Sequence, residues 1–325
     1  MALLEVKDLR VNFRTHSSVV HAVNGVSFSL DEGETLGLVG ETGAGKTTTA
    51  MSILRLLSER TGEYAGGKIL FKGKDLLTAS EKELQQVRGK HISMIFQDPM
   101  TALNPTIPII DQIEECVEIH GGHSPEEVKK LAREILEMVG IPAQRGKEYP
   151  HQFSGGMKQR VVIAMALVCS PELLLADEPT TALDVTIQAQ VLEMIQKLKE
   201  RYNTAMLLIT HDLGVVADTC DRVAVIYAGE IVEYGNLEDI FEKTAHPYTQ
   251  GLFDSLPNLD DVVERLKPIP GLMPDPANLP EGCKFHPRCQ YATEECRHTC
   301  PATVECDPGH LVCCHHPLAQ RKEET

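Results

Sequence analysis

A glycine-rich segment near the amino terminus offers the clearest chemistry in the sequence. Residues 40–47 read Gly-Glu-Thr-Gly-Ala-Gly-Lys-Thr and match the pattern G-x-x-x-x-G-K-[ST]. The glycines of such a loop let backbone N–H groups face phosphate oxygens, the lysine reaches the β and γ phosphates, and the next hydroxyl ligates Mg²⁺. A chance glycine-rich turn is the alternative. The segment follows a predicted strand and precedes a predicted helix, as this chemistry requires, so Lys46 and Thr47 are candidate ligands.

A pair of acidic residues follows an apolar run in the second half of the chain. Leu173-Leu-Leu-Ala predicts a buried strand, which would deliver Asp177 and Glu178 to its carboxyl end, where open α/β sheets bind ligands. There Asp177 would hold the hydration shell of Mg²⁺, and Glu178 would polarise an attacking water. Taken alone, the pair is equally well explained as a strand followed by an acidic helix cap.

Seven of the ten cysteines lie between residues 283 and 314. Disulfides, zinc, an iron–sulfur cluster and redox sensing are all compatible with thiols concentrated in this way. Zinc motifs usually pair their ligands as C-x₂₋₄-C, and the nearest match is Cys296-x₃-Cys300. The other three cysteines are scattered and are interpreted as small apolar core residues: Cys116, Cys169 and Cys220.

Alternating strand and helix patterns position these residues. Residues 3–38 look strand-like, with a turn near Asn24–Gly25. The alternation that follows predicts an α/β fold with a largely parallel sheet. After residue 255 prolines recur, which predicts an extended connection to the cysteine-rich tail. The further strands are expected over 34–40, 69–72, 92–96, 173–176, 205–210 and 223–227, and the helices over 46–57, 112–140, 154–167 and 185–201.

Composition narrows the function classes. The 325 residues, 42% of them apolar, suffice for one large domain or two ordinary ones. The net charge of −16 argues against a nucleic-acid partner, which would require a basic face. The start of the chain does not resemble a signal peptide, and no apolar run approaches the roughly 20 residues that span a bilayer. We therefore expect a soluble cytoplasmic protein, where structural disulfides are rare.

Four further segments complete a recognisable set. Residues 153–160 read Phe-Ser-Gly-Gly-Met-Lys-Gln-Arg, His211 follows the strand expected over 205–210, Gln97 lies in Phe-Gln-Asp-Pro, and Asp184 ends Thr-Ala-Leu-Asp. With the glycine-rich loop and the acidic pair, their order and spacing over residues 3–240 resemble the ATP-binding cassette (ABC) ATPases. The resemblance implies a P-loop ABC ATPase: a RecA-like mixed-sheet core in a domain over 1–255, a helical subdomain at about 98–168, and a small cysteine-rich extension over 256–325.

The same resemblance implies roles for individual residues. Glu178 would be the general base, His211 would contact the γ phosphate, and Gln97 would sense Mg²⁺ and the attacking water. Phe13 is the aromatic expected to stack on adenine, with a core strand residue as the equal alternative. Ser154, Gly155 and Gly156 would act on ATP bound to an opposing subunit, so the chain would hydrolyse ATP as a dimer. The remaining cofactor-binding residues are Gly40, Gly43, Ala44, Gly45, Lys46, Thr47, Thr48, Asp177 and Asp184, with Thr47 and Gln97 at the magnesium ion.

Other segments resemble one group of these ATPases. They are residues 97–105, His246-Pro-Tyr-Thr, Gly282-Cys283 and Pro287-Arg-Cys289, and they resemble the D-type ATPase subunits of dipeptide and oligopeptide importers. The resemblance implies peptide import powered by ATP-driven dimer closure, at the cytoplasmic face of the membrane. The implied partners are a homologous F-type ATPase, two transmembrane permeases and an extracytoplasmic binding protein. The alternatives are a nickel importer of the same group and a soluble ABC ATPase of DNA repair or translation.

The group also implies a ligand set in the tail. Its tail cysteines have the spacing of Cys283-x₅-Cys289-x₆-Cys296, with a last one before histidine, which aligns with Cys314. Four thiolates suit a [4Fe–4S] cluster, which some members of the group hold, and zinc is the alternative. Such a cluster would cross-link and stabilise a tail that is too small to have its own hydrophobic core. Three tail cysteines remain as substitute ligands or free thiols: Cys300, Cys306 and Cys313.

Overall fold

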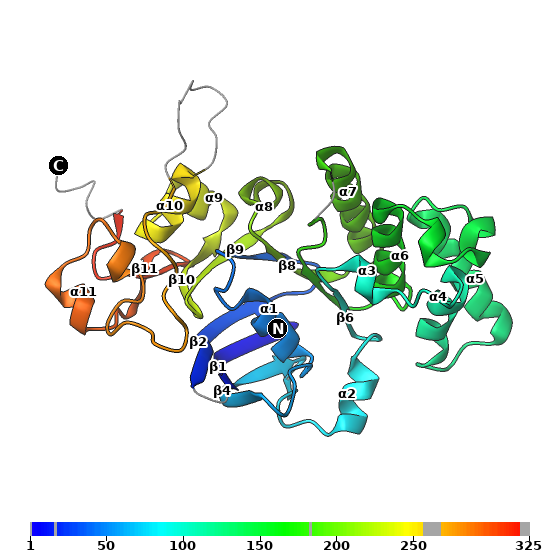
Figure 1. The fold of residues 1–325 in the computed structure, drawn as a ribbon, viewed down its shortest axis with the longest axis horizontal. Helices are drawn as coiled ribbons and strands as arrows, with labels where there is room; N and C mark the ends of the chain where they lie inside the picture. Colours follow the sequence, from blue (N-terminus) through cyan, green and yellow to red (C-terminus); the bar gives the residue numbers. More distant parts are fainter. Residues whose placement is uncertain (1, 16–17, 182–183, 256–267, 319–325) are drawn as a thin grey trace. The chain divides into compact units, whose positions relative to one another are not determined.

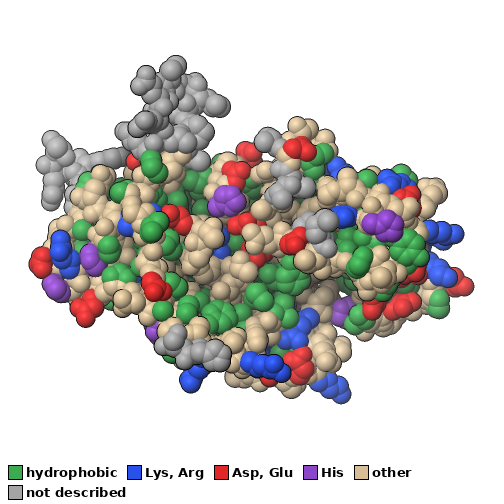
Figure 2. Space-filling view, viewed as in Figure 1, with side chains coloured by type: hydrophobic (Ala, Val, Ile, Leu, Met, Phe, Trp, Pro, Cys, Tyr) green, Lys and Arg blue, Asp and Glu red, His purple; other side chains and the backbone are tan. Residues whose placement is uncertain are grey.

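The computed structural model describes residues 2–15, 18–181, 184–255 and 268–318, which form two compact units (Figure 1). The first unit gathers the ranges Met1–Ser29, Leu36–Leu77 and Thr210–Thr325, and the second gathers Leu30–Thr35 and Thr78–Ile209. On the face shown in Figure 2, acidic side chains are interspersed with lysine and arginine. Within the described ranges, no helix combines the length and the apolar character that crossing a bilayer requires.

An antiparallel sheet begins the first unit. Its strands, in the order β2-β1-β4-β5, are β2 (Val19–Leu30), β1 (Leu4–Arg14), β4 (Gly62–Phe71) and β5 (Lys74–Asp75). The turn predicted near Asn24–Gly25 is wrong, because β2 continues through both residues. Gly25 absorbs the irregularity with a left-handed φ of 103°, opposite Asp8 of β1, where the β1–β4 register also shifts. The glycine therefore permits a left-handed residue within a continuous strand.

A second set of strands carries the glycine-rich loop and the tail. The parallel pair is β3 (Thr35–Val39) and β9 (Arg222–Tyr227), and the antiparallel strands beside β9 are β10 (Glu230–Asn236), β12 (His310–Cys313) and β11 (Thr303–Asp307). The tail hairpin thus extends the sheet through the pairs Glu233↔Val312 and Tyr234↔Leu311 (Figure 1). The accompanying helical segments are α1 (Lys46–Ile53), α8 (Leu213–Thr219), α9 (Leu237–Glu242), α10 (Pro247–Asp254), η3 (His286–Arg288) and α11 (Glu294–His298).

The second unit contains three parallel strands, ordered β8-β7-β6, and most of the helices. Every residue of β6 (Ile92–Ile95), β7 (Leu173–Asp177) and β8 (Ala205–Thr210) is buried, as expected for continuous apolar runs in a parallel sheet. The helical segments are α2 (Glu81–Val87), α3 (Pro99–Ala102), α4 (Ile109–Glu118), α5 (Pro125–Met138), η1 (Ala143–Lys147), η2 (Pro150–Gln152), α6 (Gly155–Leu167) and α7 (Val185–Tyr202).

Local signals set the ends of several helices. Ser124 and Glu127 form the reciprocal capping box of α5. The helix expected over 46–57 ends at Ile53, because Arg55 takes a left-handed φ of 50°. The boundary predicted after residue 255 borders residues 256–267, which lie outside the described ranges, and the domain limits stay a prediction.

Candidate functional site

The glycine-rich loop joins β3 to α1 within the first unit. Gly43 and Gly45 have left-handed φ angles of 85° and 102°, and Gly45 is the residue that precedes the helix. A Cβ atom at Gly45 would lie 2.5 Å from the carbonyl oxygen of Ala22, and one at Gly40 would lie 2.2 Å from that of Ile226. Glycine is therefore required at both positions. A loop of this form at a helix N-terminus binds anions through its N–H groups.

Lys46 is held inside this loop. Its side chain is buried, and its ammonium donates to the carbonyl oxygens of Gly40 (2.6 Å) and Glu41 (3.0 Å). Thr47 is exposed at the start of α1 and Thr48 is half-buried, whereas Ala44 is buried in the loop. The fold therefore gathers an ammonium, two hydroxyls and a helix N-terminus around one loop, as phosphate binding requires.

The acidic pair lies at the carboxyl end of β7 in the second unit. Asp177 is the last residue of the strand and is buried, and Glu178 follows it with a left-handed φ of 47°. The amide of Glu178 donates to the carbonyl oxygen of Ile209 at 2.9 Å, which ties this backbone to β8. A positive φ at a residue with a long side chain costs on the order of 1–3 kcal/mol, and such strain collects at functional sites.

The Glu178 carboxylate has two donors from the same unit. Its Oε2 accepts a hydrogen bond from Nε2 of Gln97 at 2.9 Å and another from the hydroxyl of Thr181 at 2.8 Å. Gln97 is exposed just beyond β6, the strand that pairs with β7. The fold thus brings together two predicted site residues separated by 81 positions, and the Thr181 contact is one that sequence reasoning missed.

The predicted signature residues lie at two helix N-termini. The Ser154 hydroxyl accepts from the amide of Met157 at the start of α6, and Asp184 accepts from the amide of Ile187 at the start of α7. Ser154, Gly155 and Asp184 are exposed. Among the described residues, no atom would lie within 4 Å of a Cβ added to Gly155, so packing within the chain does not require glycine there.

Two further predicted site residues, outside the glycine-rich loop, also lie in the first unit. His211 is exposed directly after β8 and beside Asp212, which caps α8. Phe13 is half-buried on β1, where it pairs with Gly62 of β4. Their roles toward a nucleotide stay predictions.

The four tail cysteines selected from the sequence line one pocket in the first unit. They are Cys283, Cys289, Cys296 and Cys314. Burial, with a smaller contribution from the neighbouring thiols, raises the pKa of the Cys283 thiol to about 12 and that of Cys314 to about 11. Thiols in such surroundings become thiolates only beside a cation. Three other tail cysteines lie outside this lining: Cys300 donates to Gly282, Cys313 donates to Pro301, and Cys306 is half-buried on β11.

Histidines also line the cysteine pocket. Each of them has one ring nitrogen in a hydrogen bond with a backbone or hydroxyl group outside the cysteine side chains. The four histidines are His246, His286, His315 and His316.

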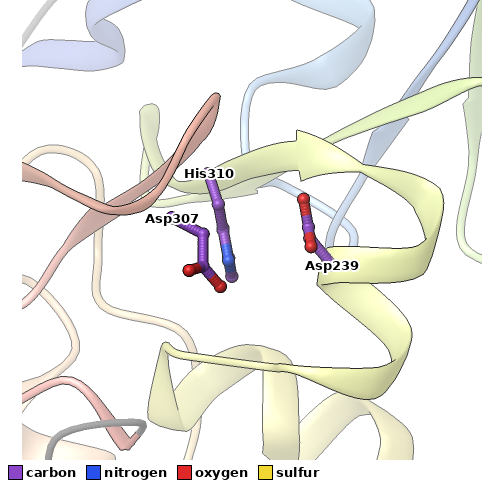
Figure 3. A group of neighbouring side chains, drawn as sticks. All are labelled: Asp239, Asp307 and His310. Atoms are coloured by element: carbon purple, nitrogen blue, oxygen red, sulfur yellow. The ribbon is translucent and has the colours of Figure 1, made fainter.

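A more compact group of potential ligands lies beside the tail hairpin. Among the described residues, one ligand atom each of Asp239, Asp307 and His310 lies within 4.8 Å of the others. Figure 3 shows the His310 imidazole between the two carboxylates. The Lys243 ammonium contacts both carboxylates, at 3.1 and 3.4 Å, and His310 Nε2 bonds to the buried Glu233 at 2.8 Å. Lys243 and His310 thus link the three carboxylates into one network of polar contacts.

The three scattered cysteines differ in burial. Cys220 is buried in the first unit, as predicted for a core residue. A Cβ atom added at Gly37 would lie 2.9 Å from its sulfur. Cys116 and Cys169 are only partly buried, and the Cys169 thiol donates to the carbonyl oxygen of Cys116 at 3.4 Å. Burial raises the pKa of Cys116 to about 11, so this thiol remains protonated.

Known proteins resemble the chain along most of its length. Residues 23–181 match the ABC transporter family, and residues 232–296 match the oligopeptide/dipeptide transporter C-terminal region. The oligopeptide transport ATP-binding protein of Bacillus subtilis is 55% identical over 89% of this chain and 82% of its own length. The dipeptide transport ATP-binding protein of the same organism is 50% identical over 96% and 94%, and the oligopeptide protein of Salmonella typhimurium is 48% identical over 98% and 95%.

Solved structures give the same result for the fold. The ATP-binding cassette MJ0796, in a dimeric post-hydrolysis state bound to ADP and phosphate, has a TM-score of 0.65 at 27% identity and covers 72% of this chain and 98% of its own. Fold and site together define an ATPase of the ABC type, with ATP and Mg²⁺ as its cofactors. The chain belongs to the ATP-binding proteins of oligopeptide and dipeptide ABC transporters. The predicted α/β cassette fold and family are confirmed.

Proposed function

We propose that the chain hydrolyses ATP to drive the import of dipeptides or oligopeptides through a membrane ABC transporter. The observation that carries this proposal is the organised Glu178 carboxylate, oriented by Gln97 and Thr181. It occurs in a chain whose relatives are named as oligopeptide and dipeptide transport ATP-binding proteins. No observation favours the nickel-importer alternative over these peptide relatives.

The residues divide the work of hydrolysis among them. The glycine-rich loop and Lys46 bind the phosphates, Thr47, Asp177 and Gln97 hold Mg²⁺, and Glu178 accepts the proton of the attacking water. The metal ion neutralises charge on the phosphates. His211 contacts the γ phosphate, and Phe13 stacks on the adenine. The phosphate-binding set is Gly40, Gly43, Ala44, Gly45, Lys46, Thr47 and Thr48.

A second cassette would complete each ATP site. Ser154, Gly155, Gly156 and Asp184 would act on ATP held by the opposing subunit, which we infer to be a homologous F-type ATPase. The exposure of Ser154 and Asp184 and the open space at Gly155 support this role. Closure of the dimer around ATP and its opening after hydrolysis would supply the conformational stroke.

The remaining partners would be two transmembrane permeases and an extracytoplasmic peptide-binding protein, with this chain peripheral at the cytoplasmic face. A groove of about 650 Å³ within the second unit supports docking of a permease segment. Its lining includes Phe96, which precedes Gln97, and the strongly exposed Ile119. An exposed apolar surface of this kind marks an interaction site.

We further propose that the cysteine pocket holds a [4Fe–4S] cluster. What supports this proposal is that Cys283, Cys289, Cys296 and Cys314 line one pocket, and four thiolates suit such a cluster. Zinc bound by the same thiolates is the alternative. The cluster would supply the positive charge that the four buried thiolates need.

Two measurements test these proposals. The chain, co-purified with its permeases and reconstituted in vesicles, should show ATPase activity stimulated by peptide and its binding protein. Stimulation by Ni²⁺ instead, or nucleic-acid binding by a chain that does not assemble with permeases, would contradict peptide import. Anaerobically purified protein should contain four iron and four acid-labile sulfide per chain. One zinc per chain without sulfide would overturn the cluster.

A further inference from the structure

An ion pair links the cysteine-rich tail to the phosphate-binding loop within the first unit. Nη1 of Arg288 lies 2.7 Å from one carboxylate oxygen of Glu41, and Nη2 lies 3.0 Å from the other. The Arg288 side chain is only 4% exposed, although it is a permanent cation. A bidentate guanidinium–carboxylate contact is strong and directional, and a buried one is costly to break from either side.

The surroundings of Arg288 fix its guanidinium independently of the loop. Its Nε donates to the carbonyl oxygen of Pro270 at 2.9 Å, and Nη1 lies 3.4 Å from the Tyr227 hydroxyl. The guanidinium carbon also lies 5.8 Å from the centre of the Tyr227 ring. Because these partners belong to the tail connection and to β9, the tail holds the arginine and the arginine holds Glu41.

Glu41 is in turn bonded to the phosphate-binding lysine. Its carbonyl oxygen accepts from the Lys46 ammonium at 3.0 Å and from the amide of Ala44 at 3.2 Å. Its own amide donates to the hydroxyl of Tyr248 in α10 at 2.9 Å. The first turn of the loop is therefore fixed from both sides, and a shift of the Glu41 backbone would alter a contact of Lys46.

The same packing reaches the cysteine pocket. Phe285, which lines that pocket, packs against Tyr227 and Tyr248 with ring centres 5.2 and 5.4 Å away. Arg288 directly precedes Cys289, one of the pocket cysteines. A continuous set of contacts thus runs from the cysteine pocket through the rings of Phe285, Tyr227 and Tyr248. It continues through Arg288 to the phosphate-binding loop.

We propose that Arg288 is a positioning residue for the phosphate-binding loop, through which the folded tail sets the affinity for ATP. The inference rests on the proposed ATPase function. A loop ordered in advance loses less conformational freedom when it closes on phosphate, so it binds more tightly. Without Arg288, part of the binding energy would be spent on ordering Glu41 and Lys46.

The test measures ATP binding to the full chain with Mg²⁺ and a fluorescent ATP analogue. Arg288→Gln and Glu41→Gln are each expected to weaken binding about tenfold, and the double variant should be no weaker than the worse single variant. Arg288→Lys should recover part of the loss, because it restores charge without the bidentate fork. The matched control is Arg297→Gln, which alters an exposed tail arginine that lies 3.7 Å from Glu294, and it should bind ATP as the unaltered chain does.

Kinetics in the assembled transporter separate positioning from a merely structural role. Arg288→Gln should raise the KM for ATP about tenfold while kcat at saturating ATP changes less than about twofold, since bound ATP reorders the loop. A lowered melting temperature with an unchanged KM would contradict the inference. If Arg288→Gln does not fold, Glu41→Gln carries the same test from the loop side. ATP affinity unchanged in Glu41→Gln, or losses that add in the double variant, would also overturn it.

Measurements on the unaltered chain separate a failure of the proposed ATPase function from a failure of the positioning inference. If the unaltered chain does not bind or hydrolyse ATP with its partners, the proposed function itself fails. If it binds ATP normally and the Arg288 and Glu41 variants match it, only the positioning inference fails.

Discussion

Glu178 is constrained more tightly than folding alone would require. Its backbone adopts a left-handed conformation at the end of β7, and its carboxylate is oriented by an amide and a hydroxyl. A strand that merely ended in an acidic cap could relax the φ angle at no loss. The strain is explained if the carboxylate must stand at a fixed place, as a general base must.

We expect Glu178→Gln to separate ATP binding from ATP hydrolysis. The amide retains the size of the side chain, so ATP should bind with near-normal affinity, while hydrolysis should fall about 100-fold or more because no base accepts the proton. Single-turnover hydrolysis and nucleotide binding in the assembled transporter measure the two effects. Arg133→Gln, at an exposed position of α5, serves as the control. Undiminished hydrolysis would remove Glu178 from its role.

Some site residues could be predicted from the sequence, whereas the Glu41–Arg288 pair could not. Lys46, Gln97 and Glu178 were found because fixed motifs carry them, and the fold gathers Gln97 against Glu178 as the motif chemistry requires. Glu41 occupies a variable position of its motif, and Arg288 lies 247 residues away. No local spacing links such a pair, because the contact depends on how the tail packs against β9.

Helix α6 shows how one element can serve folding and function differently. Its first residue, Gly155, is exposed with open space around it, whereas Gly156 faces Ile187 at a distance that leaves no room for a methyl group. Ordinary packing therefore explains glycine at 156 but not at 155. The difference favours an external contact at Gly155.

We expect Gly155→Ala to raise stability and lower activity together. Alanine in a helix is favoured over glycine by up to about 1 kcal/mol, and no described neighbour opposes it. If a second subunit's ATP approaches this point, the added methyl group should reduce ATPase activity several-fold. Thermal melting and ATPase assays of the assembled transporter measure both. Gly156→Ala is the matched variant, and it should lower the melting temperature because its Cβ would lie 2.9 Å from Ile187. Full activity in Gly155→Ala would argue against the contact.

The pairing of β10 with β12 contains a pH-sensitive contact. The hydrogen bond to Glu233 raises the pKa of His310 above its usual value, although burial opposes the shift, and Asp239 and Asp307 add to it. The charged imidazole is thus favoured in the folded state. Its contribution is fully present below the unfolded pKa of about 6.5 and is lost as the pH rises through the higher folded pKa.

His310→Gln is therefore expected to flatten the pH dependence of stability. The free energy of unfolding of the unaltered chain should exceed that of the variant most at pH 6, and the difference should shrink toward pH 9. Denaturant titrations at the two pH values measure it. His123→Gln, an exposed histidine before α5, should keep the original pH dependence. A constant difference between the unaltered chain and His310→Gln would mean that the imidazole contributes only packing.

For the whole chain, the alternation of strand and helix patterns was enough to predict the α/β fold. Strands β6, β7 and β8 are continuous apolar segments, and their burial follows from composition alone. The position of the tail was not foreseen, because β12 pairs with β10 across about 80 intervening residues that carry no register signal. The predicted turn at Gly25 failed for a related reason, since a glycine that takes a left-handed conformation within a strand has the same local signature as one that permits a turn.

The hairpin formed by β11 and β12 also has a consequence for solubility. Without it, β10 would offer neighbouring molecules an open row of amide and carbonyl groups beside the buried Val232. With it, the outermost strand is β11, which has five residues, carries Glu305 and Asp307, and is largely exposed. Short, charged margins of this kind deter strand-to-strand aggregation. The β11–β12 hairpin therefore acts as a protective border of this sheet, and a chain shortened before residue 303 would lose that border together with Cys314 of the cysteine pocket.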